Sequence, residues 1–125
     1  MNGAVLDTGA LIAFERGDRV VATMVARALE LDLRFQVPAG VVGQVWRNGR
    51  KQARLAQLLN SALVQVVPLG DAGARAAGQL CGATRTRDVI DASVVLLAQE
   101  RGVCAVTSDV DDLRRLAPDL ELVRI

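Results

Sequence analysis

Short apolar runs alternate with longer amphipathic segments along this chain. The runs lie at residues 3–7, 34–37, 63–69, 103–108 and 120–125, and several of them are apolar almost throughout. Strands that do not alternate between apolar and polar side chains are typical of a parallel sheet buried on both faces. Helices between successive strands supply the outer layers of such a sheet. The pattern therefore predicts an α/β fold.

The segments between the runs carry helical signals. Helices are predicted over residues 10–17, 19–32, 39–48, 50–62, 71–80, 88–102 and 111–117. Asp18 and Asp88 stand where N-caps are expected, and Gly102 stands where a helix should end. Residues 20–29 have the spacing of an amphipathic helix, and their apolar stripe either packs into the core of this domain or, with helix 10–16, forms a groove for a partner helix. At 125 residues, the chain is expected to form a single domain, 1–125.

Composition excludes several classes of protein. The chain has 15 basic and 14 acidic residues, so no overall charge draws it to nucleic acid or membrane. It has no histidine, which rules out Ser–His–Asp and Cys–His catalysis and His-ligated zinc. Cys81 and Cys104 lie among apolar residues and are interpreted as buried thiols. Without a basic leader or a run of about 20 apolar residues, a cytoplasmic protein with no membrane partner is expected.

Carboxylates follow the predicted strands. Asp7 ends the first run, Asp109 follows the fourth, and Asp91 lies in the first turn of the helix before that fourth run. Sites in open parallel sheets form beyond the carboxyl ends of the strands. If the first and fourth strands are neighbours, the three carboxylates meet. An all-oxygen site of this kind suits Mg²⁺ or Mn²⁺.

A structural role competes with this reading, because an Asp after a strand is often a helix cap or a turn residue. Asp88 is best interpreted as an N-cap, Asp111 as a solvated turn residue, and Asp112 as compensation of a helix dipole. Only the combination of Asp7, Asp91 and Asp109 at predicted strand ends favours a metal site.

Four stretches together resemble a known family. They are VLDTGALIAF, VPAGVVGQVWR, DASVVLLAQERG and AVTSDVDDLRRLA, and they span nearly the whole chain in order. This series resembles the PIN-domain family, and most closely the VapC-type toxins of bacterial type II toxin–antitoxin pairs. The resemblance implies a three-layer fold whose parallel sheet has four or five strands in the order 3-2-1-4-5. It also implies Mg²⁺- or Mn²⁺-dependent hydrolysis of RNA, an antitoxin partner and a homodimer.

The resemblance also assigns site residues. The family's acidic positions fall on Asp7, Asp91 and Asp109, which would be both metal ligands and catalytic residues. Thr8 and Thr107 match the family's polar residues near the first and last of these acids, and would position water or phosphate or simply form hydrogen bonds at the strand ends. Asp112 matches an additional acid of some members.

One position departs from the family pattern. The family's second acidic residue, a Glu, falls on Gln44, which keeps a carbonyl oxygen and loses a charge. Weaker metal binding is therefore expected, and Asp88, one turn before Asp91, could partly substitute in addition to its role as an N-cap. The main alternative function follows from the same residue: a catalytically weakened or inactive PIN-fold protein that binds antitoxin or RNA without cleaving it.

A local basic patch is a candidate RNA-binding surface. Arg47, Arg50, Lys51 and Arg54 would share one face if a single helix ran through them, although Asn48-Gly49 predicts a break there. A solvated helix face is the competing interpretation. Trp46 is expected in the core and not as a platform for a base.

Two other enzyme classes fit less well. A response-regulator receiver domain needs a lysine after its last-but-one strand, and the one lysine of this chain is Lys51 in a predicted helix. A phosphatase of the haloacid-dehalogenase type needs a second Asp two residues after Asp7, and Gly9 stands there.

Overall fold

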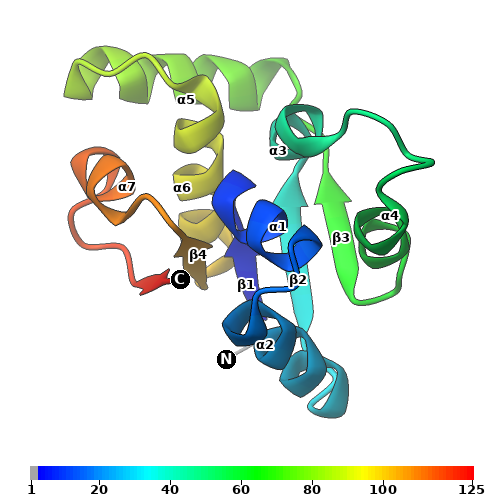
Figure 1. Cartoon of the computed structure of the whole chain (residues 1–125). Coiled ribbons are helices and arrows are strands. Elements are labelled where there is room, and N and C mark those ends of the chain that lie inside the picture. Colours follow the sequence, from blue (N-terminus) through cyan, green and yellow to red (C-terminus); the bar gives the residue numbers. More distant parts are fainter. Residues whose placement is uncertain (1–2) are drawn as a thin grey trace.

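A computed structural model describes residues 3–125, and these contain one five-stranded parallel sheet in the order β3-β2-β1-β4-β5 (Figure 1). The strands are β1 (Gly3–Leu6), β2 (Arg34–Pro38), β3 (Val64–Val67), β4 (Cys104–Thr107) and β5 (Leu122–Arg124). Both the α/β class and the strand order implied by the family resemblance are confirmed.

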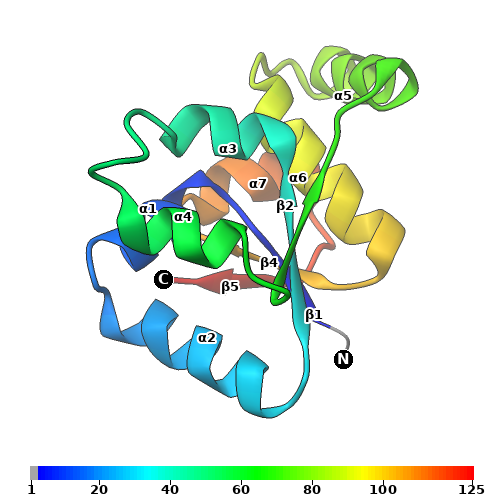
Figure 2. The same ribbon diagram turned by 90° about the vertical axis from the view of Figure 1, so that its right-hand side faces the viewer.

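Helices cover both faces of this sheet. They are α1 (Thr8–Glu15), α2 (Arg19–Glu30), α3 (Ala39–Val45), α4 (Ala53–Leu59), α5 (Asp71–Thr84), α6 (Val89–Arg101) and α7 (Val110–Leu116). Figure 2 shows α1, α2 and α4 on one side of the strands and α6 on the other, with α5 packed against α6. In the part of the chain described, none of these helices has the length and apolar character needed to cross a bilayer.

The buried strands explain the apolar runs of the sequence. Val5 of β1 and Ala105 of β4 have no exposed surface, and the helix behind them, α6, buries Val94 and Val95. Edge strand β3 is different, because Val66 is 40% exposed there. The core therefore lies around the central strands, whose carboxyl ends are held rigidly by packing on both faces.

The structure corrects the prediction for residues 39–48. Helix α3 ends at Val45, and Trp46 is extended, with φ −75° and ψ 124°. The side chain of Gln52 takes the place of the missing turn: its Nε2 donates to the Val45 carbonyl, and its Oε1 accepts from the backbone N–H of Arg47 and of Asn48.

The expectation that Trp46 lies in the core is also corrected. Trp46 is 38% exposed and lies beside Gly49, where an added Cβ would come 2.7 Å from the indole ring. In α2 the apolar stripe is divided: Val21 is buried, whereas Val20 and Leu29 are 54% and 72% exposed. Part of the stripe over residues 20–29 therefore packs into the core, and part of it is exposed.

Candidate metal centre

Two of the predicted site residues leave the sheet at the same edge. Leu6 of β1 pairs with Val106 of β4, so the chain reaches Asp7 and Asp109 beyond the carboxyl ends of adjacent strands. The backbone N–H of Asp7 donates to the Val106 carbonyl at 3.2 Å. The connections run in opposite directions from this strand pair, which makes it the point where ligands bind in open α/β sheets.

Asp7 is a buried carboxylate that also caps a helix. It is 3% exposed, and its Oδ1 accepts a hydrogen bond from the Ala10 N–H at 2.9 Å as the N-cap of α1. Burial raises the pKa of Asp7, and the charge of Asp109 raises it further, against the hydrogen bonds from Thr107 and Ala10, which lower it. The raised pKa means that a nearby positive charge would be favourable.

Asp91 lies in the first turn of α6, which Asp88 caps by accepting from the Asp91 N–H at 2.9 Å. Burial raises the pKa of Asp91 to about 7, helped by the charges of Asp88, Asp7, Asp112 and Asp109. Helix α6 thus brings its first turn to the sheet edge where Asp7 and Asp109 lie. The acidic residues nominated from the sequence act electrostatically on one another.

The polar residues nominated from the sequence join these elements together. The hydroxyl of Thr8 donates to Oε1 of Gln44, which links α1 to α3. Thr107 has no exposed surface, and its Oγ1 accepts from the Asp109 N–H at 2.8 Å. Gln44 therefore lies beside Thr8, the first residue of α1, which directly follows Asp7 in the chain.

Two glycines allow the elements around the carboxylates to come close. A Cβ on Gly9 would lie 2.0 Å from Oγ of Ser108, and a Cβ on Gly40 would lie 2.3 Å from the Cδ1 methyl of Ile90. Gly9 therefore lets the first turn of α1 approach the segment that leads from β4 to Asp109. Gly40 does the same for α3 and the start of α6.

The donor chemistry fits a hard divalent cation, since every candidate ligand is a carboxylate or amide oxygen. Within residues 3–125, however, no three acidic or cysteine side chains already stand close enough to hold one ion between them. Mg²⁺ keeps several of its waters and often uses only one or two direct carboxylates, so wider spacing is compatible with it. The assignment of Asp7, Asp91 and Asp109 as ligands and catalytic residues stays a prediction.

The basic patch predicted for RNA is not one continuous face. Arg47 uses its guanidinium to donate to the carbonyls of Gly43 and Trp46, and Arg54 lies over the ring of Phe14, 5.3 Å from its centroid. Arg50 and Lys51 lie in the connection between α3 and α4. Two of the four side chains are therefore already engaged within the protein.

A second group of basic residues, which the sequence analysis missed, lies beside the carboxylates. A cleft of about 390 Å³ is lined by Arg85, Thr86, Arg87, Asp88, Asp91, Asp112, Arg115 and Leu116. The sequence signal is the stretch TRTRD at residues 84–88, which comes immediately before the acidic start of α6. The position of Arg115 could not be inferred from the sequence, because this residue reaches the cleft only through the packing of α7 against α5 and α6.

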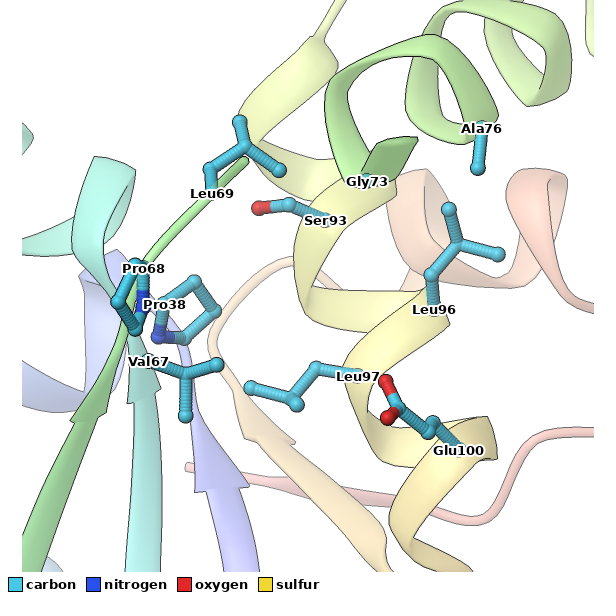
Figure 3. A pocket seen from close by; sticks show the side chains of 10 residues that line it. All are labelled: Pro38, Val67, Pro68, Leu69, Gly73, Ala76, Ser93, Leu96, Leu97 and Glu100. Atoms are coloured by element: carbon cyan, nitrogen blue, oxygen red, sulfur yellow. The ribbon is translucent and has the colours of Figure 1, made fainter. Parts of the chain in front are cut away.

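An apolar groove of about 300 Å³ lies on the other side of α6, between that helix, α5 and the end of β3 (Figure 3). Its walls are mostly Pro, Leu, Val and Ala side chains, and Glu100 is the one ionisable residue among them. None of the acidic residues nominated for a metal lines it. The groove therefore has no part in the candidate metal centre.

Both the sequence and the fold of this chain are similar to those of known proteins. A model of the PIN domain matches residues 4–118. A chain of the VapBC2 structure from Rickettsia felis, bound to a DNA fragment from the promoter, has a TM-score of 0.71 at 12% identity, and 98% of each chain is covered. A toxin–antitoxin complex from Klebsiella pneumoniae gives 0.70 at 18%, covering 98% of this chain and 99% of the other. VapBC-5 from Mycobacterium tuberculosis, a member of the VapBC family of toxin–antitoxin systems, gives 0.58 at 21%, with both chains fully covered (100%).

No curated protein is detectably similar in sequence. The structural matches are all of low identity and establish the fold. The family match extends from β1 to the end of α7 and includes every acidic residue nominated for the metal. This chain therefore belongs to the PIN-domain family.

Proposed function

We propose that this protein is a metal-dependent ribonuclease and the toxin of a toxin–antitoxin pair. The observation that carries the proposal is the electrostatic coupling around Asp91, whose pKa is raised to about 7 by burial and by the charges of Asp88, Asp7, Asp112 and Asp109. Repulsion among these carboxylates lowers the stability of the fold when no cation is bound, so their arrangement favours the binding of a cation.

Asp7, Asp91 and Asp109 would hold Mg²⁺ or Mn²⁺ at the carboxyl ends of β1 and β4. When bound, the ion lowers the pKa of a water and stabilises charge on the scissile phosphate and the leaving oxygen. Thr107 orients this end of β4 by accepting from the Asp109 N–H and donating to Asp7. The hydroxyl of Thr8 donates to the side-chain carbonyl oxygen of Gln44 and so orients that amide. This neutral oxygen would face the hydrated ion.

The partner assignment has separate support. Several structures with this fold are toxin–antitoxin complexes by description, including those from Klebsiella pneumoniae and Mycobacterium tuberculosis. Helix α2 leaves Val20 and Leu29 exposed, and Leu31 directly after it is 57% exposed. These exposed apolar side chains at the two ends of α2 are candidate contacts for an antitoxin helix. We infer an antitoxin partner, an RNA substrate and a homodimeric toxin acting in the cytoplasm.

The test is RNA cleavage by purified protein with millimolar Mg²⁺ or Mn²⁺, with chelator, and with the Asp7→Asn variant. Cleavage is expected only for the wild-type protein with metal. Cleavage that persists in chelator, or equally in the variant, would assign the activity to a contaminant or to another site. No cleavage by the wild-type protein under any of these conditions would reject the ribonuclease.

One observation favours a second function, that of a PIN-fold protein which binds RNA or antitoxin and no longer cuts. Gln44 stands where the family has a Glu, and its Oε1 is engaged by the hydroxyl of Thr8. The site thus lacks one negative charge for a cation. RNA binding in chelator without cleavage on addition of Mn²⁺ would support this second function.

A further inference from the structure

The cleft beside the carboxylates has a basic wall of three arginines: Arg85 and Arg87 from the α5–α6 connection and Arg115 from the last turn of α7. Helix α7 packs against both α5 and α6, which brings the two segments together across the cleft (Figure 1). All three arginines are exposed to solvent. The same cleft is also lined by Asp88, Asp91 and Asp112: Asp88 directly follows Arg87 in the chain, and Asp112 lies one turn before Arg115 on α7.

The side chains of these three arginines form no ion pair or hydrogen bond within the part of the chain that the structure describes. In residues 3–125 the one ion pair within 4.0 Å joins Arg75 to Asp71 at the start of α5, at the other end of that helix from Arg85. No hydrogen bond from the side chain of Arg85, Arg87 or Arg115 is present in the same part of the chain. The guanidinium groups therefore remain available to an anion from outside.

The backbone that carries Arg85 and Arg87 is firmly held. The Thr86 N–H donates to the Cys81 carbonyl at 3.0 Å, and the Thr84 hydroxyl donates to the Leu80 carbonyl at 2.8 Å. Arg85 ends α5 in the left-handed conformation, with φ 57° and ψ 42°, a position that favours glycine. The chain therefore has an arginine where glycine would be less strained, and that arginine lines the cleft.

We propose that Arg85, Arg87 and Arg115 bind the phosphate backbone of single-stranded RNA and hold it beside the carboxylates of the same cleft. This rests on the proposed ribonuclease function. A guanidinium matches the paired oxygens of a phosphodiester through two parallel N–H···O bonds. The carboxylates of the cleft repel phosphate unless a cation lies between them, so the arginines supply the attraction for the RNA backbone. The arginines act as positioning residues that hold flanking phosphates.

The test compares Arg115→Gln with Arg114→Gln. These residues are neighbours on α7 and both are exposed, but Arg114 does not line the cleft. Binding of a short fluorescent single-stranded RNA is measured by anisotropy in chelator, over about 50 to 200 mM salt. Arg115→Gln should weaken binding about tenfold, as expected for loss of a charged hydrogen bond. It should also lower the slope of log K against log salt by about 0.7. Arg114→Gln should change neither quantity by a comparable amount.

Arg85→Gly separates function from folding. Glycine adopts the left-handed conformation without strain, so this variant should melt at the same or a higher temperature than the wild type while binding RNA more weakly. In cleavage assays with Mn²⁺, the arginine variants should raise KM more than they lower kcat.

The results distinguish the two proposals. Equal losses in Arg114→Gln and Arg115→Gln, or unchanged affinity in Arg85→Gly and Arg115→Gln, would overturn the basic wall even if the wild type cleaves RNA. Displacement of the RNA by polyglutamate at equal charge concentration would also overturn it, in favour of an acidic protein partner. RNA binding that depends on these arginines, with no metal-dependent cleavage, would support the wall and reject the ribonuclease.

Discussion

Asp7 combines two roles that a single substitution can separate. Its carboxylate caps α1 by accepting from the Ala10 N–H, and it contributes charge to a crowded acidic edge while being 3% exposed. Asparagine caps helices about as well as aspartate, so Asp7→Asn removes the charge and keeps the cap. In chelator we expect the variant to melt at a temperature equal to or above that of the wild type, because both burial and repulsion from Asp109 raise the pKa of Asp7.

Thermal melts followed by circular dichroism measure this effect, and Asp7→Ala is the matched control. The alanine variant loses the cap as well as the charge, which should cost about 1 kcal/mol. A clearly lower melting temperature for Asp7→Asn than for the wild type would show that the ionised carboxylate stabilises the fold, contrary to the metal-site interpretation.

Substitution of Gln44 tests the effect of the negative charge that the family's Glu would supply at this position. Gln44→Glu changes the shape of the side chain very little and places a carboxylate beside Thr8. We expect Mn²⁺ to bind more tightly and cleavage to increase, since the new charge attracts the cation. In chelator the same charge should lower the melting temperature through repulsion. Calorimetric titration of Mn²⁺ into both proteins measures the difference, and equal affinities would show that residue 44 lies outside the metal's reach.

The sequence reveals some of these residues and conceals others. Asp7 and Asp109 follow apolar runs, so their places at strand ends could be predicted from local pattern alone. Gln44 required the family resemblance, because nothing in its helix distinguishes it. Arg85 and Arg115 could not be paired in advance, since they meet only where α7 packs against α5 and α6.

At the scale of the element, helix α6 depends on its N-cap. Asp88 accepts from the Asp91 N–H, and its charge also raises the pKa of Asp91. Asp88→Ala should therefore destabilise the protein by about 1 kcal/mol, whereas Asp88→Asn should keep most of the cap. Denaturant unfolding measures both variants, and equal losses would show that the cap contributes little.

Asp88→Asn has a second expected effect on the same helix. With the Asp88 charge removed, the pKa of Asp91 should fall from its raised value toward the ordinary range for Asp, since that charge is the largest contribution after burial. Carboxyl chemical shifts in an NMR titration report it. An unchanged titration of Asp91 would show that the two carboxylates are not coupled.

Element boundaries mark the limit of local pattern. The caps at Asp18 and Asp88 and the end of α6 at Gly102 could be predicted, because each depends on neighbours within one turn. The end of α3 at Val45 could not, because the side chain of Gln52, seven residues away, satisfies the Val45 carbonyl. The same connection leaves Trp46 38% exposed, against the usual tendency of tryptophan to be largely buried.

At the scale of the whole molecule, the strand order brings acidic side chains together although their mutual repulsion does not stabilise the fold. The order β3-β2-β1-β4-β5 places β1 beside β4, and with them the carboxylates of Asp7 and Asp109. Burial and mutual repulsion at this edge raise the pKa values of Asp7 and Asp91, the latter to about 7. Stability should therefore depend on pH in a direction opposite to that of most acidic residues in proteins.

The direction follows from proton binding. The pKa of Asp91 rises from 3.8 to about 7 on folding, so between these values the folded chain binds more protons than the unfolded chain. The stabilisation is fully present below 3.8 and is lost as the pH rises through about 7. In chelator the melting temperature should fall between about pH 4 and pH 7, and Asp91→Asn should reduce this fall.

Mn²⁺ should reverse the trend, because a cation binds the ionised carboxylates of the folded chain and its binding adds to stability once its concentration exceeds the dissociation constant. Protons compete for the same groups, so the increase in melting temperature on adding millimolar Mn²⁺ should be larger near pH 8 than near pH 5. Differential scanning calorimetry at both pH values, with Asp91→Asn as the control, measures this. An increase of equal size at both pH values, or one that Asp91→Asn retains, would show that the ion binds away from Asp91. Either result would contradict a metal site formed by the carboxylates that the fold brings to this edge of the sheet.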